Sequence, residues 1–325
     1  EEVMPPRIVP GGEAIKNDFS IVSKIIKILI ERRLCRHSFV VVIGGGAVLD
    51  AIGFAASLVH RGLRLVRVPT TVLSQCDAGV GIKNGINLCG GKNTIGTFSP
   101  PFAVLNDFSM LSSLPDREWS GGIAEAFKVS IICDPSFFRW LCRHAPSLKA
   151  KNQEAMESMI RRCAKRHLQH IQKSGDPFEH GRARPLDFGH WSAHKLEAMS
   201  RYRIGHGEAV ATGVALDSCY AAIKGWITER QLKAIYNGLQ QSGLALWHDE
   251  LEQRAKDGML EIMKGLRDFK EHIGGELCLT FPKGIGKRFE VHEMDNDLIE
   301  KAVQYLKRMT KPAQGDTRNL SNLSP

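Results

Sequence analysis

Three histidines lie close together in the second half of the chain. His190 and His194 are four residues apart, so they share one face if their segment is helical. His206 follows a break at Gly205 and leads into an apolar run at 209–222. Imidazoles from two neighbouring elements can hold a metal ion or grip an anion, but His-x-x-x-His also occurs by chance on helices. The spacing alone leaves ordinary core or surface histidines as an equal alternative.

A carboxylate stands in an apolar stretch upstream. Glu125 and Lys128 are one helical turn apart, and the apolar residues continue to 132. A buried carboxylate needs a partner, which either the lysine or a metal ion would provide. A plain surface ion pair is the alternative. One glutamate with two histidines is a known catalytic zinc set that leaves a position open for substrate.

A glycine turn lies near the start of the chain. Gly44, Gly45 and Gly46 follow an apolar run at 39–43 and precede a helical apolar pattern at 47–59. Glycines in this setting let the backbone approach a pyrophosphate, whose charge the helix N-terminus favours. The turn is not Gly-x-Gly-x-x-Gly, so a plain tight turn remains the alternative.

Taken in order, these segments resemble the 3-dehydroquinate synthases and the wider group of sugar-phosphate cyclases. The resemblance covers about residues 8–300 and rests on several motifs. These are the glycine loop at 41–50, the segment at 68–77, Lys83, the segment at 91–96, the Glu125 helix, Phe-Gly-His-x-x-x-His at 188–194 and His-Gly-Glu at 206–208.

The resemblance implies two cofactors, NAD and a divalent metal, zinc or else cobalt. It makes Glu125, His190 and His206 the metal ligands. The residues it places around NAD are Glu13 and Lys16 at the adenosine ribose, Gly44, Gly45 and Gly46, Asp50 near the nicotinamide, and Thr70 and Thr71. For Glu13 and Lys16 the alternative interpretation is the start of a surface helix.

The activity implied by the resemblance is that of a carbon–oxygen lyase. NAD transiently oxidises a hydroxyl of a seven-carbon sugar phosphate, phosphate is eliminated, and reduction, ring opening and an intramolecular aldol step close a carbocycle. The phosphate would meet Lys83, Asn93 and His194, with Arg61 from a second subunit of a homodimer. Asp77, Lys92 and Lys128 match positions around the reacting hydroxyls and the cofactor. For Lys83 and Lys92 the alternative is solvated loop charge.

Several positions depart from the standard 3-dehydroquinate synthase pattern. The lysine and arginine that read a substrate carboxylate correspond to Gln169 or His170 and to Ala183, which precedes Arg184. Asp187 replaces an asparagine, and His272 replaces part of a lysine pair, as in cyclases of sedoheptulose 7-phosphate. These changes disfavour an anionic group and favour a neutral polyol end. True 3-dehydroquinate synthase and, less strongly, a metal-dependent polyol dehydrogenase remain the alternatives.

Composition agrees with a cytoplasmic enzyme. The eight cysteines contain no Cys-x-x-Cys, no signal-peptide pattern opens the chain, and no apolar run is long enough for a membrane span. The net charge of +9 suits phosphorylated ligands. Lysine and arginine are dispersed without a basic stripe interleaved with aromatic residues, which argues against nucleic acid.

The element pattern predicts an α/β fold. A Rossmann-like nucleotide-binding domain at 1–115 precedes a mainly helical metal- and substrate-binding domain at 116–310 and a disordered tail at 311–325. Compared with the family, the first domain is expected to lack an N-terminal strand–helix unit. Strands are predicted at 39–43, 65–68, 103–106 and, as a hairpin or edge strand, 277–281. Helices are predicted at 47–59, 118–132, 136–144, 152–172, 207–224, 229–242 and 295–309.

Overall fold

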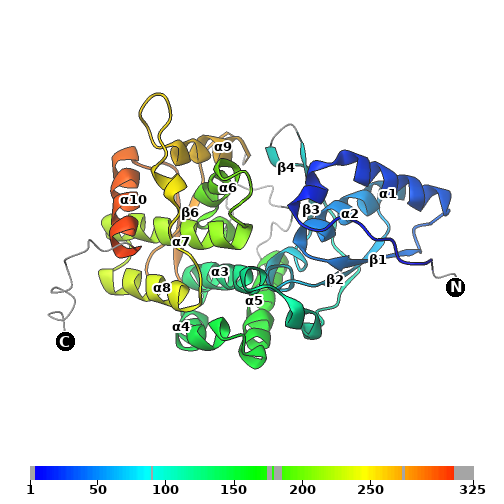
Figure 1. Ribbon diagram of the computed structural model, residues 1–325, viewed down its shortest axis with the longest axis horizontal. Coiled ribbons are helices and arrows are strands. Elements are labelled where there is room, and N and C mark those ends of the chain that lie inside the picture. Colours follow the sequence, from blue (N-terminus) through cyan, green and yellow to red (C-terminus); the bar gives the residue numbers. More distant parts are fainter. Residues whose placement is uncertain (1–3, 89–90, 174–177, 179–184, 273–274, 311–325) are drawn as a thin grey trace. The chain divides into compact units, whose positions relative to one another are not determined.

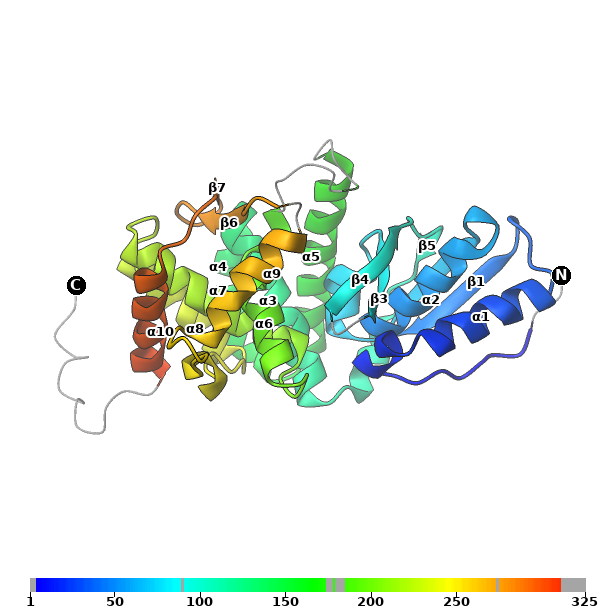
Figure 2. The same ribbon diagram turned by 90° about the horizontal axis from the view of Figure 1, so that it is seen from above.

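The structure is a computed structural model that describes residues 4–88, 91–173, 178, 185–272 and 275–310. The chain divides into two compact units (Figures 1 and 2). Unit 1 comprises Glu1–Ile123 and Gln153–His180, and unit 2 comprises Ala124–Asn152 and Gly181–Pro325. A single division near residue 115 does not describe these units, because the helix α5 (Gln153–Lys173) belongs to unit 1 although it follows a segment of unit 2.

Unit 1 is built on a small parallel sheet. Its strands have the order β1-β2-β5, and β1 pairs with β2 from Phe39 opposite Arg64 to Gly44 opposite Pro69. A second, antiparallel pair, β3-β4, follows β2 in the chain. The strands are β1 (Phe39–Gly44), β2 (Arg64–Pro69), β3 (Lys83–Leu88), β4 (Gly91–Phe98) and β5 (Ala103–Val104). The helices are α1 (Phe19–Glu31), α2 (Gly46–Leu58) and α5, with the first part of α3 (Asp116–Cys133).

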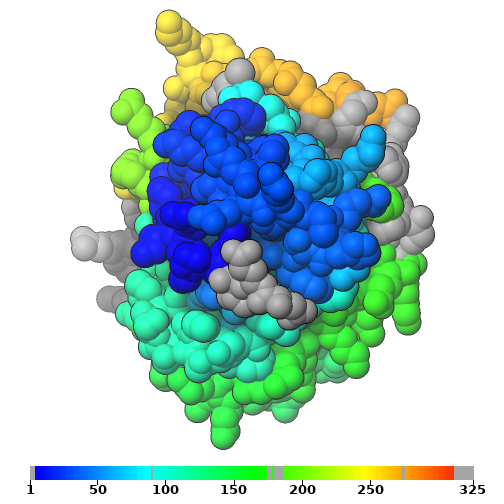
Figure 3. Space-filling view, turned by 90° about the vertical axis from the view of Figure 1, so that its right-hand side faces the viewer, coloured from blue at the N-terminus to red at the C-terminus, as the bar shows by residue number. Residues whose placement is uncertain are grey.

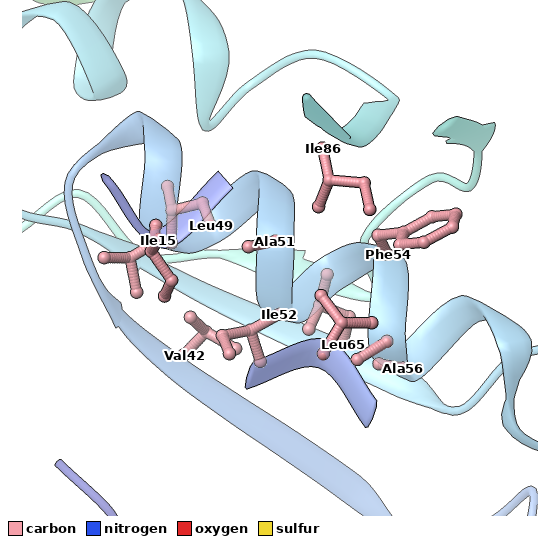
Figure 4. Packing of buried hydrophobic residues seen from close by; sticks show 12 residues of the cluster. Ile15, Val42, Leu49, Ala51, Ile52, Phe54, Ala56, Leu65 and Ile86 are labelled. Atoms are coloured by element: carbon pink, nitrogen blue, oxygen red, sulfur yellow. The ribbon is translucent and has the colours of Figure 1, made fainter. Parts of the chain in front are cut away.

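The core of unit 1 forms around α2, which is apolar on nearly all sides. A helix of this kind must be covered on every face. It packs against β1, β3, α1 and the short 3-10 helix η1 (Glu13–Asn17). Figure 4 shows its side chains among those of the neighbouring elements. The labelled residues of this core are Ile15, Val42, Leu49, Ala51, Ile52, Phe54, Ala56, Leu65 and Ile86.

The glycine turn connects β1 to α2 with a single residue. β1 ends at Gly44 and α2 begins at Gly46, so Gly45 alone lies between them. A Cβ on Gly44 would lie 2.8 Å from Cβ of Val48. A Cβ on Gly45 would lie 3.2 Å from Cγ2 of Thr71. No side chain caps the N-terminus of α2.

Unit 2 is built around α7 (His206–Ile223). Nearly every residue from Gly207 to Ala221 is buried, and α6, α8, α10 and β6 pack against this helix. The other helices are the second part of α3, α4 (Pro135–Lys149), α6 (His190–Met199), α8 (Glu229–Gln241), α9 (Lys264–His272) and α10 (Asn296–Thr310). The strands β6 (Leu279–Pro282) and β7 (Arg288–Val291) form an antiparallel hairpin.

Most predicted elements are confirmed, and four were missed. The strand–turn–helix at 39–58, the helices after residue 115 and the late hairpin are present. The helix predicted at 136–144 continues to Lys149 through Pro146. The missed elements are α1, the β3–β4 hairpin, α6 and α9. The tail at 311–325 lies outside the described residues.

Figure 3 shows one face of the molecule, on which the N-terminal residues of unit 1, in blue, are nearest the viewer. The strand β1 lies at an edge of its sheet, and its alternate residues Phe39, Val41 and Ile43 are exposed.

In the described part of the chain, no helix is both long and apolar enough to cross a membrane.

The backbones of α6 and α7 approach closely at Gly213, which gives a first prediction. A Cβ on Gly213 would lie 2.1 Å from the carbonyl oxygen of Gly189. The obstructing atom belongs to the backbone, and Gly189 has a φ of 79°, a conformation that residues with a side chain rarely adopt. The Gly213→Ala variant should lose about 1–3 kcal/mol of unfolding free energy by overpacking. Urea titration would show this, and Gly11→Ala, where a Cβ meets nothing within 4 Å, should stay near the parent.

Candidate functional site

The candidate metal site begins with a buried carboxylate in α3. The side chain of Glu125 is 1% exposed and that of Lys128 is 2% exposed. Both lie on one face of the helix, and the lysine ammonium contacts Oε2 of the glutamate. The interpretation of these residues as a surface ion pair is therefore wrong.

Two histidines from separate helices face the other oxygen of this carboxylate. His190 is the first residue of α6 and His206 the first residue of α7. In each ring Nε2 lies 3.6 Å from Oε1 of Glu125. The three predicted ligands are thus brought together, with their donor atoms within 4.8 Å of one another.

Hydrogen bonds at the far ring nitrogens orient both imidazoles. Nδ1 of His190 lies 3.2 Å from the carbonyl oxygen of Phe188, which can only accept, so Nδ1 carries the proton. Nδ1 of His206 lies 3.1 Å from Oε2 of Glu197, which is buried at 3% exposure. In both rings Nε2 is left as the electron-pair donor facing Glu125. Such partners fix the tautomer and orientation of metal-binding histidines.

The donor set fits a divalent metal. Ligand atoms at about 2.0–2.1 Å from a tetrahedral zinc ion are about 3.3 Å apart. The observed separations of 3.6 Å come within a few tenths of an ångström of that value. Burial, reinforced by the nearby charge of Lys128, lowers the pKa of His190 to about 4. The ring is therefore neutral near pH 7, as a metal ligand must be.

His194 lies beside the three donors. It is one turn after His190 on α6, and the centroid of its ring is 5.4 Å from that of His190 and 5.9 Å from that of His206. It also forms a second metal-competent group with Glu197 and His206. His206 belongs to both groups.

Unit 1 gathers a different set of predicted residues. Nζ of Lys16 lies 2.8 Å from Oδ2 of Asp50 and also donates to the side-chain oxygen of Asn93. Glu13 accepts from the amide of Asn87 at 2.9 Å. Lys16 is only 3% exposed, so the interpretation of a surface helix start is wrong for this residue. The lysine joins residues from η1, α2 and β4.

The loop after β2 carries Thr70, Thr71 and Asp77. The backbone N–H of Thr70 donates to the carbonyl of Gly44, which ties this loop to the glycine turn. Asp77 lies in the short π-helical turn Ser74–Ala78, and its Oδ1 is 2.8 Å from Nδ1 of His167 on α5. Asp77 therefore has a histidine partner within unit 1.

The remaining predicted residues are less closely grouped. Lys83 and Arg61 have exposed side chains, and Lys92 is half-buried in β4. Asp187 lies in the 3-10 turn Pro185–Asp187, close enough for its charge to act on the pKa of His190. His272 is the last residue of α9, and Ala183 and Arg184 lie outside the described residues.

Four residues near these sites were not predicted. Arg67, fully buried on β2, donates to the carbonyl oxygens of Ala78, Gly79, Gly81 and Lys83 and to Oδ1 of Asn84. The others are His167, Glu197 and Asp217. Glu197 could have been found, because it follows His190 by seven residues and His194 by three, and so shares their helical face.

The orienting role of Glu197 gives a second prediction. Glu197→Gln removes the negative charge behind His206 and should weaken zinc or cobalt binding about 10–100-fold, as is usual for such partners. A competitive titration of the metal-free protein against a chromophoric chelator would measure this. Glu290→Gln, at an exposed position in the same unit, is the control and should keep the parent's affinity. An unchanged affinity in Glu197→Gln would remove the basis for this role.

Comparison with known families accounts for most of the chain. Residues 7–121 match the model described as 3-dehydroquinate synthase N-terminal, and residues 122–268 match 3-dehydroquinate synthase C-terminal. The 3-dehydroquinate synthase of Vibrio atlanticus is 33% identical over 302 residues, which are 93% of this chain and 81% of that protein. The enzyme of the same name from Alkaliphilus metalliredigens is 34% identical over 92% of this chain and 82% of its own.

Solved structures of sugar-phosphate cyclases are also similar to this chain. The 2-epi-5-epi-valiolone synthase of Streptomyces hygroscopicus subsp. jinggangensis, with NAD+ and Zn2+ bound, has a TM-score of 0.85 and 30% identity, covering 93% of this chain and 82% of its own. A 2-deoxy-scyllo-inosose synthase complexed with carbaglucose-6-phosphate, NAD+ and Co2+ has a TM-score of 0.77 and 26% identity, covering 91% and 81%. A glycerol dehydrogenase from Schizosaccharomyces pombe, at 16% identity and a TM-score of 0.62, shares the fold alone.

Proposed function

The chain belongs to the 3-dehydroquinate synthase family, and we propose that it is an NAD- and divalent-metal-dependent cyclase of a heptulose phosphate that carries no carboxylate. The observation that carries the proposal is the convergence of Nε2 of His190 and Nε2 of His206 on Oε1 of Glu125. The similar valiolone and inosose synthases were solved with NAD+ and a divalent metal, which supports both cofactors here.

Glu125, His190 and His206 would hold the metal in unit 2. When bound, it supplies a Lewis acid that polarises a substrate oxygen. Lys128 contacts the second carboxylate oxygen, and Oε1 faces the imidazoles. His194, next to both rings, can hold or move a proton for the departing phosphate.

The glycine turn and the residues around it would hold NAD in unit 1. When bound, NAD supplies a hydride acceptor. Gly44 and Gly45 let a pyrophosphate approach the backbone, and the N-terminus of α2 favours its charge. Asp50 is held by Lys16, which sets the position of its carboxylate at the first turns of the same helix. Thr70 and Thr71 lie beside the turn.

Cationic and amide groups would receive the substrate phosphate. These are Lys83, Lys92 and Asn93, together with Arg61 of a second subunit in a homodimer. Lys83 and Arg61 are exposed, so both can reach a ligand. A plain polyol dehydrogenase has no phosphate to bind and would not need this set.

Asp187 supports a neutral rather than an anionic substrate end. Its carboxylate raises the pKa of His190, which supports a position near the proposed metal ligands. A substrate carboxylate facing Asp187 would be repelled, whereas a hydroxymethyl group could donate a charge-assisted hydrogen bond to it. His272, at the end of α9, and the loss of the family lysine at Gln169 or His170 agree with this choice.

The alternative function is 3-dehydroquinate synthase itself. The names of the curated relatives favour it, and these relatives cover nearly the whole chain. The two functions share cofactors and differ in the charge of the substrate end. They are therefore separated by substrate preference and not by cofactor dependence.

Phosphate release tests the proposed chemistry. The protein is incubated with sedoheptulose 7-phosphate and catalytic amounts of NAD, before and after treatment with a chelator. We expect phosphate release that requires both NAD and metal, with no net accumulation of NADH because the hydride returns to the product. Accumulation of NADH in proportion to substrate would instead indicate a polyol dehydrogenase.

A further inference from the structure

A buried carboxylate on α7 connects this helix to the start of α6. Asp217 is 1% exposed and lies three turns after His206 on the same helix. Its Oδ2 accepts from the backbone N–H of Gly189 at 3.1 Å, and its Oδ1 accepts from Nε1–H of Trp191 at 2.9 Å. Each oxygen of the carboxylate thus has its own donor.

The two donors are the immediate neighbours of His190. Gly189 fixes the backbone before the histidine, and Trp191, itself 1% exposed, fixes the side chain after it. Gly189 has a φ of 79°, a conformation that ends the preceding turn and aims the first residue of α6. Nδ1 of His190 in turn donates to the carbonyl of Phe188. Hydrogen bonds of three residues, Gly189, His190 and Trp191, therefore fix the segment that carries the imidazole.

This arrangement is costly to maintain. Burial raises the pKa of Asp217 to about 7, against the opposing effect of its two hydrogen bonds. Burying a carboxylate costs free energy even when it is hydrogen-bonded, so stability alone does not explain its presence here. Its contacts converge on the residues that flank one proposed metal ligand.

We propose that Asp217 is a positioning residue that sets the orientation of the His190 imidazole toward the metal, through Gly189 on one side and Trp191 on the other. The inference rests on the proposed metal site. Asp217 does not touch the metal or the substrate and acts only through α6.

The test uses cobalt, because its absorption reports ligand geometry independently of activity. Asp217→Asn keeps the shape of the side chain but replaces one of its two acceptor oxygens with an NH2 group, so it can no longer accept from both donors. Trp191→Phe removes one donor and leaves the carboxylate. We expect each variant to bind Co2+ about 10–100-fold more weakly, as for other outer partners of ligating histidines, with a changed visible spectrum. Combining the two changes should cost less than the sum of the single costs, because both act on one contact.

Ser218→Ala is the matched control. Ser218 is adjacent to Asp217 in the chain. Its replacement removes a buried hydrogen bond from Oγ to the carbonyl of Val214, within α7 itself. It should lower stability without altering the cobalt spectrum. If Asp217→Asn does not fold, the cobalt affinity and spectrum of Trp191→Phe are sufficient for the test.

The outcomes separate this inference from the proposed function. A parent protein that binds no Co2+ would overturn the metal site itself. A parent that binds Co2+, with variants that keep its affinity and spectrum, would overturn the positioning role and leave the metal site standing. Weaker binding with an altered spectrum in both variants, and an unaltered spectrum in Ser218→Ala, would support it.

Discussion

Glu125→Gln should abolish tight metal binding and lower kcat/KM by about 10³-fold or more. A metal supplies several kcal/mol of charge stabilisation, and about 1.36 kcal/mol corresponds to a factor of ten in rate. The neutral amide retains an oxygen but not the charge that Oε1 offers to the metal between His190 and His206. Metal content after gel filtration and the rate of phosphate release would measure the two effects.

Two further variants distinguish loss of metal binding from loss of folding. Glu125→Gln leaves the Lys128 ammonium buried without its anion, which is itself destabilising. The double variant Glu125→Gln with Lys128→Met removes that charge, so it should regain stability without regaining metal. Glu118→Gln changes an exposed glutamate on the same helix and should resemble the parent. Parental metal affinity in Glu125→Gln would contradict the assignment.

Arg67→Met should lower the free energy of unfolding by at least about 3 kcal/mol, since buried carbonyl oxygens that lose a charged donor each cost about 1–3 kcal/mol. Arg67 donates to the carbonyl oxygens of Ala78, Gly79 and Gly81, which end the segment that carries Asp77. We also expect weaker NAD binding, because this segment begins beside the glycine turn. Urea unfolding and NAD titration would measure these changes.

Arg64→Met is the matched control for that prediction. Arg64 lies on the same strand but on the opposite face, where it contacts the rings of Phe39 and Phe102. Its replacement should cost much less stability. Equal losses in the two variants would show that the contacts of Arg67 with the loop have no special importance.

Local pattern was enough to predict some of the elements that carry the candidate site. The β1–Gly45–α2 unit followed from an apolar run, a glycine turn and a helical pattern in direct succession. The Glu125 helix and α7 followed in the same way from their apolar patterns, whereas the spacing of His190 and His194 did not by itself predict α6. The family resemblance then named three ligands that the structure brings together from three helices.

Long-range partners could not be predicted from spacing. Lys16 pairs with Asp50 and Asn93, which are 34 and 77 residues away in the chain, so no local period links them. Asp217 likewise meets Gly189 and Trp191 only because α6 and α7 approach at Gly213. The hairpin β3–β4 was missed because its residues are glycine- and asparagine-rich and lack a regular alternation of apolar side chains.

The preference between two substrates tests the proposed function most directly. We would measure kcat/KM for sedoheptulose 7-phosphate and for the carboxylated heptulosonate phosphate of 3-dehydroquinate synthase, in the parent and in Asp187→Asn. Like-charge contact costs several kcal/mol, so the parent should prefer the neutral substrate by about 10²-fold or more, and Asp187→Asn should narrow that preference. The proposed function would be contradicted if the parent prefers the heptulosonate and Asp187→Asn leaves that preference unchanged. This result would identify a 3-dehydroquinate synthase.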